Sequence, residues 1–171
     1  MSLTAMRCAW LLLPLAMTGC QTLDAELTPP ELDVAAFRCE VEPVLMARCA
    51  SYACHGDGGR PFRIFAINRL RLNPERAASG YVLNAPMTPE EHAANLDMAL
   101  GFVEPGDFER SQLLLKPLDV DAGGWFHRGG SIYGRIDVFS SEDDVGYEAI
   151  EAWLAGGTRQ PDCEPNEEVG R

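Results

Sequence analysis

The chain has 171 residues, of which 46% are hydrophobic and 23% are charged; these values exclude wholesale disorder and fit one compact domain. Its formal net charge of −12 makes the surface repel nucleic acids and anionic lipids. We therefore expect no nucleic-acid partner, and we expect charged partners to be basic. No apolar run reaches the roughly 20 residues that a transmembrane helix needs.

The N-terminal residues have the three parts of a secretory signal: a weakly basic start that ends at Arg7, an apolar stretch over 8–17, and small residues before Cys20. The sequence L-A-M-T-G-C that ends at Cys20 resembles the processing box of bacterial lipoproteins, in which the cysteine is acylated. We expect 1–19 to be a lipoprotein signal peptide, Cys20 to carry the lipid, and 20–33 to form a tether. A secreted protein with an unmodified Cys20 is the alternative.

A helix is predicted over residues 37–48, because apolar side chains recur there at helical spacing, with Pro43 as a kink or restart. It leads into Cys49, Cys54 and His55, which form the pattern C-x4-C-H, a longer version of the C-x-x-C-H pattern that attaches a haem covalently. Two nearby thiols can add to the two vinyl groups of the porphyrin, and the adjacent histidine then lies under the iron. The alternative is a disulfide between these cysteines beside a surface histidine.

Two later helices have clear boundaries in the sequence. Thr88 begins a capping box, Thr-Pro-Glu-Glu, with proline at the first helical position. The acidic stretch over 140–144 is typical of a helix start, and Gly156 is typical of a helix end. Between them, one apolar stripe predicts the last helix: Tyr147, Ile150 and Leu154. The fold of the long middle segment, 58–120, cannot be read from its pattern.

The order of the later motifs resembles a known family. The run over 111–117 ends in Lys-Pro; His127-Arg128-Gly129-Gly130, then Tyr147, and finally the Trp-led helix end over 153–157 follow it. These motifs, with C-x4-C-H, are similar to bacterial cytochrome c domains of the C-x4-C-H type. The resemblance implies a mainly α, cytochrome c-like single domain over 34–163 with a long middle insertion. The polar residues after it predict a flexible tail over 164–171.

The resemblance also implies one covalent haem c, bound through Cys49 and Cys54, with His55 as the proximal iron ligand. For the distal ligand we favour His127, because glycines on both sides let the backbone approach a flat macrocycle and aromatic residues precede it. Met87 and His92 are the alternative ligands, as is an open position. In this family the terminal helices pack together, which implies a disulfide between Cys39 in the first helix and Cys163 after the last.

The expected function is electron transfer by a haem c lipoprotein of the bacterial envelope, and we do not expect an enzyme. The lipid on Cys20 would hold the protein to a membrane, facing the periplasm or the cell surface; we prefer the outer membrane because Gln21, not aspartate, follows that cysteine. Basic redox proteins are the expected partners. Two alternatives remain: a haem-based sensor or gas-binding lipoprotein, and a haem-free structural lipoprotein stapled by disulfides.

Overall fold

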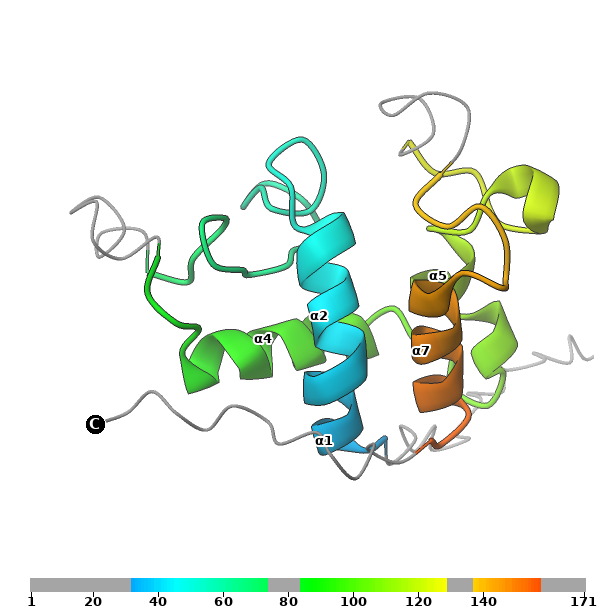
Figure 1. Ribbon diagram of the computed structural model, residues 1–171, viewed down its shortest axis with the longest axis horizontal. Coiled ribbons are helices and arrows are strands. Elements are labelled where there is room, and N and C mark those ends of the chain that lie inside the picture. Colours follow the sequence, from blue (N-terminus) through cyan, green and yellow to red (C-terminus); the bar gives the residue numbers. More distant parts are fainter. Residues whose placement is uncertain (1–31, 74–83, 129–136, 158–171) are drawn as a thin grey trace, which may run out of the picture.

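The structure is a computed structural model that describes residues 32–73, 84–128 and 137–157 (Figure 1). The predictions for the signal peptide, for the lipid on Cys20, for most of the tether, for Cys163 and for the tail lie outside the described residues. Within the described ranges, every helix is too short or too polar to cross a bilayer.

The first helical segment runs from residue 34 to residue 49 and alternates between two kinds of helix. Asp33 caps it, because its side chain accepts the backbone N–H groups of residues 35 and 36 at 2.8 and 2.9 Å. Pro43 has no N–H to donate, and wider π-type turns flank the short α-helix that contains it. The helix predicted over 37–48 is confirmed. Its parts are α1 (Val34–Ala36), a π-turn (Phe37–Val41), α2 (Glu42–Val44) and a second π-turn (Leu45–Cys49).

Helix α4 (Pro89–Leu100) confirms the helix start predicted at Thr88. The Thr88 hydroxyl oxygen accepts the N–H of Glu91 at 3.2 Å, and the Glu91 carboxylate accepts the N–H of Thr88 at 3.0 Å. These reciprocal bonds form the capping box. Figure 1 shows α4 crossing the first helical segment, and the side-chain amide of Asn95 joins the two by donating to Glu42 at 2.8 Å.

Helix α7 (Val145–Leu154) also begins and ends where the sequence predicts. The Asp144 carboxylate caps its start by accepting the N–H of Gly146 at 2.8 Å. Gly156, with φ of +84°, ends it in the left-handed conformation that favours glycine. Helix α7 lies beside the first helical segment, where the rings of Phe37 and Trp153 have centroids 5.2 Å apart (Figure 1). The first and last helices therefore share one apolar core.

Shorter elements connect α4 to α7. They are a 3-10 turn (Phe108–Arg110), α5 (Gln112–Leu115) and a second 3-10 turn (Val120–Ala122). Leu118 and Phe139 form an isolated parallel bridge, which joins the segment after α5 to the segment before α7. No β-strand occurs in the described part of the chain. The protein is mainly α, as the sequence predicts.

A buried ion pair ties the segment before α4 to the helix. The guanidinium of Arg71 donates twice to the carboxylate of Glu91, each time at 2.8 Å, and each side chain is 3% exposed. Arg71 also donates to the backbone carbonyls of Ala85 and Pro86, at 2.9 and 3.0 Å. Two further N–H groups of this buried charge thus position the turn that precedes α4.

Replacing Glu91 by glutamine is expected to destabilise the fold by about 3–5 kcal/mol, because the buried Arg71 charge then lacks its carboxylate. Burial alone would raise the pKa of Glu91, but the hydrogen bond from Arg71 and those from the N–H groups of Thr88 and Leu72 outweigh it and lower that pKa. The ion pair therefore stabilises the fold fully at pH values above the pKa of an ordinary carboxyl. This stabilisation is lost as the pH falls through the lowered pKa of Glu91.

Chemical denaturation of the wild type and of Glu91→Gln, at neutral and at acid pH, checks this prediction. The difference in unfolding free energy should shrink in acid, and the exposed change Glu109→Gln serves as the matched control. Equal stability of the two proteins at neutral pH would contradict the role of the pair.

Cys39 is disulfide-bonded in the structure, whereas Cys49 and Cys54 are thiols, so the partner of Cys39 lies outside the described residues. The predicted partner, Cys163, also lies there. We expect mass spectrometry of a non-reduced digest to show Cys39 linked to Cys163. A bridge that closes so long a loop stabilises by about 4–5 kcal/mol in the chain-entropy model. Free thiols at both positions would contradict the pairing.

Candidate functional site

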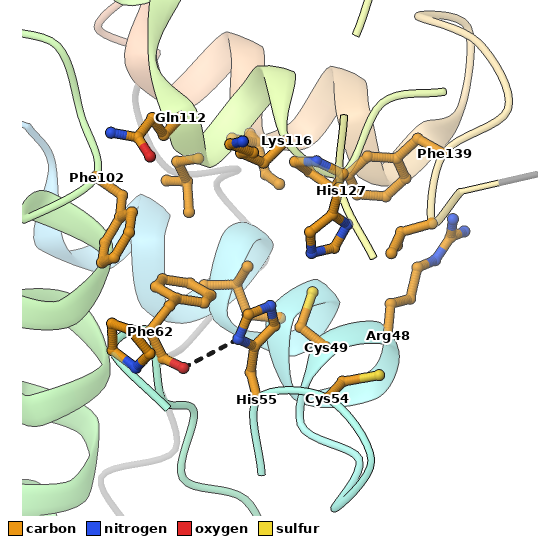
Figure 2. Close-up of a pocket in the computed structure, with 16 residues that line it drawn as sticks. Arg48, Cys49, Cys54, His55, Phe62, Phe102, Gln112, Lys116, His127 and Phe139 are labelled. Atoms are coloured by element: carbon orange, nitrogen blue, oxygen red, sulfur yellow. Dashed lines mark hydrogen bonds between the residues drawn. The ribbon is translucent and has the colours of Figure 1, made fainter. Parts of the chain in front are cut away.

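An apolar pocket opens between the loop that follows the first helical segment and the region from α5 to α7 (Figure 2). Its cavity volume is about 210 Å³. The residues that line it are Leu45, Arg48, Cys49, Cys54, His55, Pro61, Phe62, Phe102, Gln112, Leu113, Lys116, Pro117, His127, Val138, Phe139 and Ile150.

The C-x4-C-H motif folds back on itself, which brings all three of its functional side chains to this pocket. The first helical segment ends at Cys49, and the N–H of His55 donates to the carbonyl of Cys49 at 3.0 Å. A Cβ at Gly56 would clash with the carbonyl oxygen of Ala50, so only glycine fits the return of the chain. The tight loop places Cys49, Cys54 and His55 along one wall (Figure 2).

Cys49 and Cys54 are thiols in the structure, so the alternative of a disulfide between them does not hold there. Cys49 is buried, and burial, with the neighbouring Cys54, raises the pKa of its thiol to about 12. A thiol with this pKa stays protonated at neutral pH, and the thiolate is the reactive form. Cys49 in the folded chain is therefore a poor nucleophile.

The imidazole of His55 is held in one orientation. Its Nδ1 atom lies 3.0 Å from the carbonyl oxygen of Phe62 and must donate to it, since a carbonyl can only accept. The Phe62 ring packs edge-on against it, with centroids 4.8 Å apart. Burial lowers the pKa of His55, partly offset by the bond to Phe62, and so favours the neutral imidazole. The neutral form is the one that binds metals.

His127 lies across the pocket from His55 (Figure 2). The two ring centroids are 5.8 Å apart, and the ring planes differ by 4°. The Nδ1 atom of His127 lies 2.9 Å from the carboxylate of Asp137. Among the described residues, the Nε2 atom of neither histidine makes a hydrogen bond.

This arrangement suits a metal ion between the two rings. A bond between a metal ion and an imidazole nitrogen is about 2 Å long, so two imidazoles on opposite sides of one ion have ring centres about 6 Å apart. Histidines that bind metals usually donate their other ring N–H to a carbonyl or a carboxylate. His55 and His127 each have such a partner at Nδ1.

The other candidate ligands lie elsewhere. Met87 is buried outside the pocket, in the turn before α4. The Nδ1 atom of His92 lies 2.7 Å from the buried carboxylate of Glu42, which also accepts from Asn95. His127 is thus the candidate that the structure brings together with His55 in the pocket.

Several residues in or beside the pocket have no signal in the sequence. Asp137 reaches His127 across ten positions of the chain, and the carbonyl of Phe62 serves His55 through its backbone, so no side-chain pattern marks either partner. Arg48 donates to both oxygens of Asp144 at 2.8 Å and lies over the ring of Phe139. The sequence places Arg48 at the end of the helix predicted over 37–48 and does not indicate its contact with Asp144.

In the described residues, no group of three or more histidine, cysteine, aspartate or glutamate side chains is arranged to hold a metal ion. No protein-family model matches the chain, and no curated protein or solved structure shows significant similarity to it.

Proposed function

We propose that the protein is a monohaem, cytochrome c-like electron carrier of the bacterial cell envelope. The observation that supports this most is the position of His55 and His127, whose parallel rings are 5.8 Å apart in the pocket that also contains both motif cysteines. The packing of the first helical segment against α7 supports the cytochrome c-like fold, in which terminal helices meet.

The pocket residues fit a covalently bound haem. Cys49 and Cys54 would hold the porphyrin through thioethers: each sulfur adds to one carbon of a vinyl group, and the thiol proton goes to the other. His55 and His127 would bind the iron. Phe62, Phe139 and the other apolar lining residues would keep water from the macrocycle. A haem held in this way supplies a reversible one-electron couple at its iron.

The protonated state of Cys49 bears on how the haem is attached. Since burial raises the pKa of this thiol to about 12, the folded chain is not expected to attach haem by itself. Attachment before folding, by the maturation machinery of an exporting cell, avoids this difficulty. This agrees with the signal peptide expected over 1–19.

The cellular setting follows from the sequence. Lipidation at Cys20 would place the domain at a membrane surface of the envelope, on the tether over 20–33. The net charge of −12 would steer basic redox proteins toward it, at rates that fall as the ionic strength rises. Carrying electrons requires no catalytic residues, so we propose a carrier and not an enzyme.

The reduced protein tests this proposal. After maturation in a host with haem-attachment machinery, the protein should be reduced and reoxidised reversibly. The ferrous form should show a six-coordinate spectrum that carbon monoxide does not change. Ready uptake of carbon monoxide would instead favour the gas-binding or sensor alternative, and a protein without haem would favour the structural one.

A further inference from the structure

The two facing histidines differ in what holds their Nδ1 atoms. The partner of His55 is a neutral backbone carbonyl, that of Phe62, at 3.0 Å. The partner of His127 is the side-chain carboxylate of Asp137, at 2.9 Å. The imidazole of His55 is thus bound to a neutral dipole and that of His127 to an acidic group. The proposed electron transfer alone does not require this difference.

Asp137 is held firmly in place. Its carboxylate oxygen Oδ1 also accepts the N–H of Val138, at 2.8 Å, and its own N–H donates to the side chain of Asp119, at 3.0 Å. Two residues later, the N–H of Phe139 donates to the carbonyl of Pro117, at 2.9 Å. These bonds fasten the Asp137 backbone to the segment after α5, so that the carboxylate has little freedom to leave the imidazole.

The carboxylate is also shielded from solvent. The side chain of Asp137 is 5% exposed, and that of His127 is 22% exposed. In the described part of the chain, no arginine or lysine forms an ion pair with Asp137. Its charge thus acts mainly on the pocket, where it also contributes to the high pKa of Cys49, after burial and Cys54.

We propose that Asp137 is a positioning residue for His127 and that its carboxylate lowers the reduction potential of the pocket's iron. This inference rests on the proposed function. By accepting from Nδ1, Asp137 fixes the tautomer in which Nε2 carries no proton and can bind a metal. A carboxylate acceptor makes an imidazole a stronger donor to a metal, and the stronger donor favours the more oxidised, more positive ion.

The variant Asp137→Asn tests this inference, since it keeps the shape of the side chain and removes its charge. We expect its reduction potential to be higher than that of the wild type. We also expect its ferrous form to bind carbon monoxide more tightly than the wild type does, because an uncharged acceptor makes His127 a weaker ligand. Asp137→Glu, which keeps a carboxylate, should return the potential toward that of the wild type.

The matched control is Asp121→Asn, which removes a charge at an exposed position of the preceding 3-10 turn. An equal potential in both asparagine variants, with haem bound in each, would overturn the role of Asp137 and leave the proposed function standing. Wild-type protein without haem would overturn both. If Asp137→Asn fails to mature, the ferric EPR spectrum of the wild type decides: a weak axial field, typical of two neutral imidazoles, would contradict the inference.

Discussion

Changing both Cys49 and Cys54 to alanine should abolish covalent haem binding, because these thiols lie along the pocket wall with His55 and are the only proposed attachment points. Either single change should leave one thioether and one intact vinyl group. The pyridine haemochrome spectrum reports this directly, since its band position depends on how many vinyl groups have reacted. Denaturing gels stained for haem should show no signal for the double variant.

Ser51→Ala, in the same loop, is the matched control for the cysteine changes and should mature with a full complement of haem. The prediction fails if the double alanine variant still carries haem that resists denaturation and extraction.

Replacing His127 should open the sixth iron position, because its ring faces that of His55 at 5.8 Å. The ferrous His127→Ala protein should take up carbon monoxide readily, whereas the wild type should not. His127→Met should give a reduction potential above that of the wild type, since methionine with histidine favours the reduced iron more than two histidines do. Visible spectroscopy and redox titration measure these effects.

His92→Ala is the matched control, because the structure places this histidine against the buried carboxylate of Glu42 and outside the pocket. Met87→Leu is a second control, at a buried position in the turn before α4. Neither change should alter the axial spectrum. Loss of six-coordination in either control, with the His127 variants unaffected, would contradict the assignment of His127 as the distal ligand.

The sequence predicts the helix boundaries well, because local contacts make them. The capping box at Thr88, the cap at Asp144 and the left-handed Gly156 are each formed by residues that are close in the chain. The same holds for C-x4-C-H, whose tight return depends on Gly56. The sequence alone therefore indicates that Cys49, Cys54 and His55 lie close together.

Long-range contacts could not be predicted in this way. The ion pair of Arg71 with Glu91 and the bond from His127 to Asp137 join residues 20 and ten positions apart, across stretches whose sequence has no periodic pattern. The sequence favours His127 as the distal ligand and keeps Met87, His92 and an open position as alternatives. Burial and partners separate them, and these depend on how α4 and the segment after α5 pack.

The central claim is that one porphyrin is bound through positions 49 and 54, with the adjacent imidazole on its metal. The most direct measurement is mass spectrometry of the mature protein and its digest, after expression with the haem-attachment machinery. We predict one haem per chain, on the peptide that contains Cys49, Cys54 and His55. A chain with the mass of the unmodified polypeptide, or a peptide in which those two sulfurs are joined to each other, would contradict it.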